Sequence, residues 1–154
     1  KVVQALGLTN TPTHQEWFFG PKGYRFSEIG ARPPGVCFWD VHNLANDMDL
    51  YVAWAEVVAV GRCSQRPSRR YAAALQAIRP TADGTIRAYE GMDRIQAKYG
   101  AFISKAHLPP VGSPARPVEG GFMANAWLML RHPNFDVLKL ILEDIEATVK
   151  IHAG

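Results

Sequence analysis

Residues 13–32 decide the fold; they read Thr13-His-Gln-Glu-Trp-Phe-Phe-Gly-Pro-Lys-Gly-Tyr-Arg-Phe-Ser-Glu-Ile-Gly-Ala-Arg32. Two runs rich in aromatic and β-branched residues, 13–19 and 24–29, flank the segment Gly-Pro-Lys-Gly. Proline suits the second position of a type I turn, and glycine accepts the positive φ that follows it. We therefore predict an antiparallel hairpin whose three-residue loop is closed by Gly20 and Tyr24.

This closure sets three opposed pairs on one face of the hairpin: Glu16 with Glu28, Phe18 with Phe26, and His14 with Gly30. Directly opposed carboxylates lie about 5 Å apart and repel each other. A hard divalent cation such as Mg²⁺ binds carboxylate oxygens together with phosphate oxygens, and two adjacent phenyl rings suit a flat aromatic ligand. The alternative is a solvated hairpin whose glutamates point into water, and the residues alone leave both interpretations open.

An arginine follows the second carboxylate. Arg32 lies four residues after Glu28, in a segment that Pro33 and Pro34 keep out of helix and strand. Metal-binding carboxylates and a nearby guanidinium are the groups that proteins use to hold a transferring phosphoryl group. The stretch therefore predicts a phosphoryl-transfer site. For His14, beside it, a substrate contact and a structural role both stay open.

At these residues the sequence resembles the ATP-grasp ligase superfamily. The resemblance rests on Glu16, on the twelve-residue step to Glu28, and on Glu28-Ile-Gly-Ala-Arg32 in the place of that family's Glu-x-Asn-x-Arg signature. The longer string over residues 26–35, Phe-Ser-Glu-Ile-Gly-Ala-Arg-Pro-Pro-Gly, is similar to one subgroup of ATP-grasp ligases.

The resemblance implies a role for each matching residue. Glu16 and Glu28 correspond to the carboxylates that bridge Mg²⁺ (or Mn²⁺) to the phosphates of ATP. Phe18 corresponds to an apolar residue that packs on adenine, and Arg32 to the catalytic arginine that steadies the acyl phosphate. Gly30 departs from the pattern, because many members place a metal-ligating asparagine there. We therefore expect a second metal to be held more weakly, or by water.

The function implied is that of the C-terminal portion of an ATP- and Mg²⁺-dependent ligase. Such a ligase activates a small carboxylate as an acyl phosphate, which an amine or similar nucleophile attacks. The phosphate-cradling glycine-rich loop and the strand lysines of the family are not in the sequence, which opens on Lys1-Val-Val-Gln without a methionine. We expect an upstream part of the same protein to supply them and the fragment alone to be inactive. Whether the protein forms a homodimer stays open. A biotin-carboxylase-like, bicarbonate-activating enzyme is the alternative, weakened because Pro-Pro-Gly follows Arg32.

The rest of the chain predicts an α+β fold. Before residue 60 we expect helices over 2–6, 38–46 and 49–60. The resemblance implies that these helices and the hairpin are the C-terminal part of an ATP-grasp fold (1–60). An arginine-rich linker (61–70) follows. We expect residues 71–154 to form a small antiparallel β lobe with a C-terminal helix, which resembles the C-terminal lobe of biotin-carboxylase-type enzymes. Its expected strands are 71–79, 85–89, 101–108 and 121–130, and its expected helices are 92–99 and one that begins after the N-cap Asn134.

Composition narrows the remaining function classes. The chain is 47% hydrophobic and 20% charged, and its net charge of +3 is too small to argue for nucleic acid. No apolar stretch approaches a membrane span, and the spacing of its two cysteines fits neither a disulfide framework nor a zinc site. We expect a cytoplasmic protein. A non-catalytic module that binds anionic partners through residues 62–70 is the competing class. For Glu119, Asn125 and His132 we expect ordinary polar surface positions. The alternative, that they line a substrate pocket, is less favoured.

Overall fold

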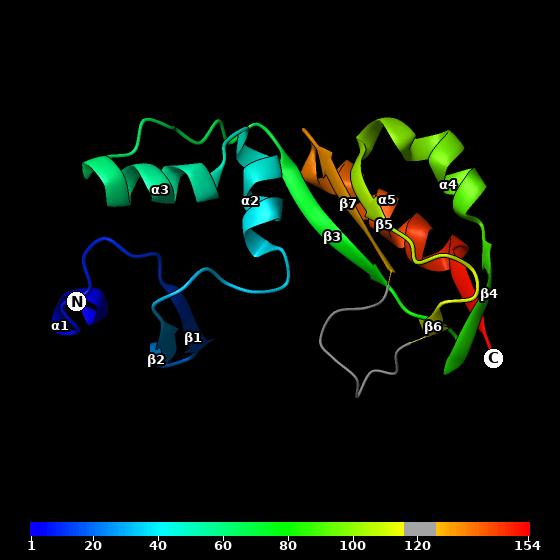
Figure 1. Ribbon diagram of the computed structural model, residues 1–154, viewed down its shortest axis with the longest axis horizontal. Helices are drawn as coiled ribbons and strands as arrows, with labels where there is room; N and C mark the ends of the chain where they lie inside the picture. The colour runs from blue at the N-terminus through cyan, green and yellow to red at the C-terminus, as the bar shows by residue number, and fades with distance from the viewer. Residues whose placement is uncertain (116–125) are drawn as a thin grey trace. The chain divides into compact units, whose positions relative to one another are not determined.

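The structure is a computed structural model that describes residues 1–115 and 126–154 (Figure 1). Contacts divide the chain into two compact units, which we describe separately. The N-terminal unit comprises Lys1–Asn43 and Met48–Pro67, and the C-terminal unit comprises Leu44–Asp47 and Ser68–Gly154. The change of unit at Pro67–Ser68 falls within the segment expected to be a linker, while the functional bounds 1–60 and 71–154 stay a prediction.

Strands β1 (His14–Gly20) and β2 (Gly23–Gly30) form the antiparallel hairpin, which is a two-stranded sheet by itself. Glu16 lies opposite Glu28 and His14 opposite Gly30, as predicted. The loop is tighter than predicted, because Gly20 pairs with Gly23, whose φ of 74° lets the chain turn over two residues. The register shifts after Glu16, so that Ser27 is the extra residue of a β-bulge on β2.

The N-terminal unit also contains helices α1 (Val2–Ala5), α3 (Leu50–Val60) and most of α2 (Phe38–Asn46), close to the predicted ranges. The Asp49 carboxylate caps α3 by accepting hydrogen bonds from the next two free backbone N–H groups, at 2.8 and 3.1 Å. Gly61 ends α3 in the left-handed conformation, with φ of 71°. Both ends of α3 are therefore fixed by its own sequence.

The arginine-rich segment is tied to α3 rather than free. The side chain of Gln65 accepts from the backbone N–H of Asp49 at 2.7 Å and donates to its carbonyl at 3.0 Å. Ser64 donates to Glu56 through its backbone N–H and its hydroxyl, at 2.8 and 2.7 Å, and these bonds lower the pKa of that carboxyl. The segment thus lies along the helix, while its four arginines stay exposed.

Two three-stranded antiparallel sheets form the C-terminal unit (Figure 1). One has the order β3-β7-β5, in which β7 (Ala126–His132) lies between β3 (Ala72–Ile78) and β5 (Ile103–His107). The other has the order β6-β4-β8, in which β4 (Gly84–Glu90) lies between β6 (Pro114–Ala115) and β8 (Lys150–Ala153). Helices α4 (Met92–Tyr99) and α5 (Phe135–Thr148) complete the unit, with the short 3₁₀ helix η1 (Gly100–Phe102).

A single apolar core holds this unit together. Helix α5 begins at the predicted N-cap, where the side chain of Asn134 accepts from the N–H of Val137 at 3.1 Å. It packs against β3 and β7. The largest side chains buried in this core come from both sheets and both helices: Ile86, Ile95, Leu128, Leu130, Ile141, Ile145 and Ile151.

Two strands of this unit were not predicted. β6 (Pro114–Ala115) is too short to leave a pattern, and β8 (Lys150–Ala153) follows α5 with no turn residues between them. Val149 is the C-cap of α5 and leads directly into β8, which pairs with β4. The predicted strand 121–130 is described from Ala126 onward, where it continues to residue 132. Glu119, Asn125 and the start of that strand lie outside the described residues.

Candidate functional site

The bulge after Glu16 sorts the side chains of the hairpin into two chemically different faces. Side chains alternate along a strand, so the pairing on either side of the bulge assigns each residue to a face. We call one the carboxylate face: His14, Glu16, Phe18, Arg25, Glu28 and Gly30. We call the other the aromatic face: Trp17, Phe19, Tyr24 and Phe26, in which Trp17 meets Phe26 edge to face at 5.3 Å and Phe19 meets Tyr24 at 4.9 Å.

Glu16 and Glu28 are directly opposed on the carboxylate face, and the side chain of Glu16 is 53% exposed. The nearest basic group to Glu16 is His14, whose Nε2 lies 4.0 Å from Oε1. Within the described ranges, the carboxylate of Glu28 makes no ion pair or hydrogen bond. Two like charges therefore face each other without a strong cation from this part of the chain.

The side chain of Arg32 lies over Gly30, at one end of the carboxylate face. A Cβ at Gly30 would lie 3.4 Å from Cγ and 3.4 Å from Nε of Arg32, so the arginine side chain occupies the space above that glycine. Gly30 is two residues after Glu28 and therefore on the same face. The guanidinium donates to the carbonyl of Pro33 at 3.0 Å. The structure thus brings Arg32 to the end of the carboxylate face.

The prediction that Phe18 lies opposite Phe26 is wrong. Because of the bulge, Phe18 lies opposite Arg25, while Phe26 pairs with Trp17 on the other face. Phe18 is 69% exposed on the carboxylate face. Arg25 donates to the carbonyl of Tyr24 at 3.3 Å and is the residue of this face that the sequence reasoning missed. A bulge at a serine has no clear sequence signal, so only the turn geometry could have indicated it.

The donor set fits a cation that is shared with a ligand. Across the described residues, no three His, Cys, Asp or Glu side chains are grouped closely enough to hold a metal ion. Two carboxylates are nevertheless the usual protein contribution to a Mg²⁺ site, since this ion keeps several waters and takes phosphate oxygens. Glu16 and Glu28 therefore fit the binding of a metal–phosphate complex and do not fit a closed, all-protein metal site.

The other polar residues considered in the sequence have structural partners. In the C-terminal unit, Nδ1 of His132 accepts from the N–H of Asn134 at 2.9 Å, and its ring meets Phe102 edge to face at 4.7 Å. These contacts fix the start of α5. His132 thus has a structural role. No helix in residues 1–115 and 126–154 is both long and apolar enough to cross a membrane.

Comparisons with known proteins identify the fold. No family model matches the sequence, and no curated protein sequence matches it. Among solved structures, an L-amino acid ligase from Bacillus licheniformis is similar, with a TM-score of 0.74 and 15% identity over 99% of this chain and 38% of the ligase. Phosphoribosylglycinamide synthetase from Anaerococcus prevotii has a TM-score of 0.72 and 14% identity over 99% and 39%.

A third structure agrees with these two. N5-carboxyaminoimidazole ribonucleotide synthetase from Thermotoga maritima has a TM-score of 0.66 and 13% identity, over 99% of this chain and 40% of the synthetase. The chain has the ATP-grasp-like α+β fold of these enzymes. It spans about two fifths of the length of the structures it matches.

Proposed function

We propose, from the ATP-grasp-like fold as premise, that this chain is the C-terminal portion of an ATP- and Mg²⁺-dependent ligase. The ligase would activate a small carboxylate as an acyl phosphate and pass the acyl group to an amine or similar nucleophile. The observation that carries the proposal is the carboxylate face, where Glu16 and Glu28 are opposed and Arg32 lies above Gly30.

Each residue of the face has a distinct role in this proposal. Glu16 and Glu28 would hold Mg²⁺ (or Mn²⁺), which when bound neutralises charge on the ATP phosphates. Arg32 would bind the oxygens of the acyl phosphate and so stabilise the charge that develops during transfer. Phe18, exposed on the same face, would pack on the adenine ring. We assign no general base.

The test is ATP turnover in the full-length protein that contains this chain. Glu16→Gln and Glu28→Gln should each lower carboxylate-dependent phosphate release by about two orders of magnitude or more, as expected for loss of a key electrostatic group. The matched control is Glu143→Gln, which removes an exposed carboxylate on α5 whose ion-pair partner among the described residues is Lys139, at 3.8 Å. Near-normal rates for either hairpin variant at limiting Mg²⁺ would overturn the proposal.

The chain by itself provides a second test. It covers 38–40% of the matched enzymes, and its sequence contains no phosphate-cradling glycine-rich loop. Residues 1–154 alone should therefore show no ATP turnover and at most weak nucleotide binding. Robust Mg²⁺-dependent hydrolysis by a chain whose intact mass matches residues 1–154 would contradict this assignment.

Binding of anionic partners by the arginine-rich segment stays a prediction. Arg62, Arg66, Arg69 and Arg70 are exposed and make no ion pair within the described part of the chain. Nucleic-acid affinity that falls steeply with salt and is unchanged in Glu16→Gln would favour this second candidate. Affinity that is absent at low salt would exclude it.

A further inference from the structure

Arg25 is the charged residue of the carboxylate face to which the proposed function gives no role. The register places it directly across from Phe18, next to the turn, and directly opposed side chains leave a sheet on the same side. Both residues are exposed. An exposed guanidinium and an exposed aromatic ring therefore share one row of this face.

The guanidinium of Arg25 makes no ion pair with any described residue, although Glu16 and Glu28 lie in the next row. Successive rows on one face of a sheet are about 7 Å apart, so an arginine could lean toward those carboxylates. Nη1 of Arg25 instead donates to the carbonyl of Tyr24, the preceding residue, at 3.3 Å. This hydrogen bond holds the guanidinium in its own row, beside Phe18.

The order of the rows gives the carboxylate face a direction. Arg32 lies at the end away from the turn. The carboxylate pair is in the middle, and Phe18 and Arg25 are at the turn end. If the pair holds a metal–triphosphate and Arg32 holds the transferred phosphoryl group, the nucleoside must extend toward the turn. There the ring of Phe18, which is 69% exposed, offers a flat apolar surface.

We propose that Arg25 binds the base of the nucleotide, with its guanidinium stacked on the ring that also covers Phe18. A guanidinium is planar and stacks on aromatic faces, where the charge adds a cation–π attraction. The proposal rests on the proposed function and adds a base-binding residue to it. Because the contact is made with the base and not with the phosphates, it contributes to the affinity for ATP and not to the chemical step.

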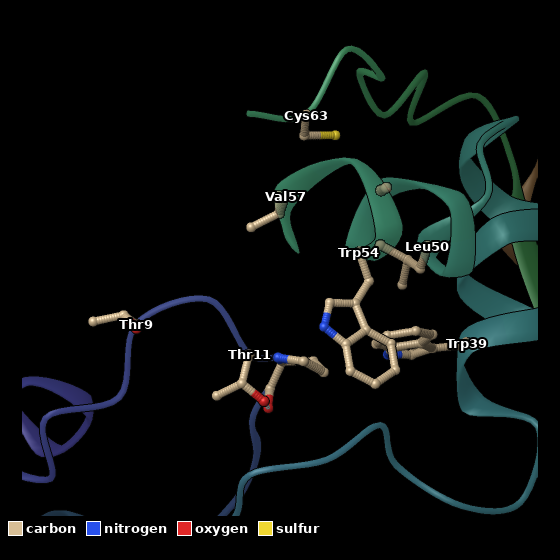
Figure 2. Close-up of a pocket in the computed structure, with 9 residues that line it drawn as sticks. Thr9, Thr11, Trp39, Leu50, Trp54, Val57 and Cys63 are labelled. Atoms are coloured by element: carbon tan, nitrogen blue, oxygen red, sulfur yellow. Dashed lines mark hydrogen bonds between the residues drawn. The ribbon is translucent and has the colours of Figure 1, made fainter. Parts of the chain in front are cut away.

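Another surface of the N-terminal unit also suits a flat ring. An apolar cavity of about 230 Å³ lies beside α3 (Figure 2). In Figure 2 the side chain of Trp54 extends from α3 beside that of Trp39, and the two rings meet edge to face at 5.9 Å. None of the residues that line this cavity is charged or belongs to the hairpin. A base bound there would depend on Trp54 and not on Arg25.

The experiment measures the binding of two ligands to the full-length protein by calorimetry, with Mn²⁺ present. One is a slowly hydrolysed ATP analogue, and the other is inorganic tripolyphosphate, which has the phosphates without the base. Arg25→Ala should weaken binding of the analogue about tenfold, within the range of a cation–π contact. It should change binding of tripolyphosphate less than about twofold. Equal losses for the two ligands, or wild-type affinity for the analogue, would overturn the proposal.

Two other replacements of Arg25 test the stacking itself. Arg25→Tyr keeps a flat side chain and should bind the analogue more tightly than Arg25→Lys, which keeps the charge without the planar group. The reverse ranking would overturn the proposal. The matched control is Arg87→Ala, because Arg87 is also exposed and donates to a backbone carbonyl, that of Gly154 at 2.9 Å. This variant should bind both ligands as wild type.

Turnover of ATP provides a second readout for Arg25→Ala. The KM for ATP should rise about tenfold while kcat stays within about twofold of wild type, because the lost contact is the same in the ground state and in the transition state. A fall in kcat with an unchanged KM would overturn the proposal.

Two further variants separate the ways in which the account can fail. Glu28→Gln should weaken Mn²⁺-dependent binding of both ligands, because it removes a proposed metal ligand. Unchanged binding of both ligands in Glu28→Gln would overturn the proposed function itself. Trp54→Leu should leave binding of the analogue unchanged. A larger loss in Trp54→Leu than in Arg25→Ala would place the base in the cavity beside α3 and overturn the proposal for Arg25.

Discussion

The two units of the chain bury apolar side chains to very different extents. Among the described residues, thirteen apolar residues of the C-terminal unit are buried, from both sheets and from α4 and α5. In the N-terminal unit only Trp39 and Ala53 are buried, although its sequence is rich in aromatic residues and valine. Since burial of apolar surface is the main favourable contribution to folding, the C-terminal unit has its own core. The N-terminal unit, by contrast, leaves most of its large apolar side chains exposed.

The largest expected effect comes from the core of the C-terminal unit. Leu128 is fully buried in β7, the central strand of its sheet. Leu128→Ala should lower the free energy of unfolding of this unit by about 2–5 kcal/mol, through lost burial and the cavity left behind. Val58→Ala in residues 1–154 should change stability by less than about 0.5 kcal/mol. Urea unfolding followed by residue-resolved NMR measures both changes. Equal losses of stability in the two variants would contradict the difference in burial between the units.

A smaller effect concerns the contact between α4 and α5. Asp144 on α5 accepts from Lys98 Nζ at 2.6 Å, from the hydroxyl of Tyr99 at 2.7 Å and from that of Thr148 at 3.1 Å. These hydrogen bonds, chiefly the one from Lys98, hold the pKa of this carboxyl well below its usual range. A carboxyl with a depressed folded-state pKa stabilises the fold above its unfolded pKa, and this stability is lost as the pH falls below about 4.

Asp144→Asn should therefore lower the melting temperature of the C-terminal unit at pH 7. The difference from wild type should shrink as the pH is lowered from about 4 toward 2, because protonation removes the same interaction from the wild-type protein. Melting curves over pH 2–7 measure this difference. A difference that stays constant across that range would show that the carboxylate charge does not join the two helices.

Removing one charge of the hairpin should have a still smaller effect on stability. In chelator, Glu28→Gln relieves a like-charge contact, so hairpin stability should hold or rise by a few tenths to about 1 kcal/mol. The matched control is Glu90→Gln, because Glu90 faces His152 Nε2 at 2.7 Å and gains nothing from neutralisation. Amide exchange in β1 and β4 reports the two effects. A marked loss of hairpin stability in Glu28→Gln would contradict the repulsion between the opposed carboxylates.

The smallest expected effect is that of Gly30→Ala. Its Cβ would meet only the flexible side chain of Arg32, at 3.4 Å, so stability should change by less than about 0.5 kcal/mol. Gly91→Ala is the contrasting variant: there φ is 79° and the Cβ would clash with the carbonyl oxygen of Thr148. It should destabilise the C-terminal unit clearly in thermal melts. Equal effects of the two variants would contradict the placement of Arg32 over Gly30.

Much of the fold could be predicted from local signals in the sequence. The helix of α5 followed from its N-cap Asn134 and its apolar spacing, and the hairpin followed from Gly-Pro-Lys-Gly between two strand-like runs. These signals are local, because the residues that cause them lie within a few positions of one another. β6 and β8 were missed since two- and four-residue strands form only through their long-range pairing with β4.

Part of the site could also be predicted from local signals in the sequence. The Glu16–Glu28 pair was predicted correctly because it lies on the side of the bulge where the register is unchanged. The position of Phe26 was wrong, since the turn closes between Gly20 and Gly23 and the pairing on the turn side of the bulge is therefore shifted by one residue. The exposure of α3 could not be predicted, because its apolar composition indicates a buried helix.

Binding of Mn²⁺ to the full-length protein, followed by electron paramagnetic resonance in the presence of a slowly hydrolysed ATP analogue, tests the central claim most directly. Glu16→Gln and Glu28→Gln should each weaken nucleotide-dependent Mn²⁺ binding at least tenfold, because each removes one of two protein ligands. The loss of Mn²⁺ affinity in the double variant should be well below the product of the two single losses, since both residues serve one site. Glu143→Gln should bind as wild type. Unchanged Mn²⁺ affinity in both single variants would contradict the assignment of the carboxylate face as the metal–nucleotide site.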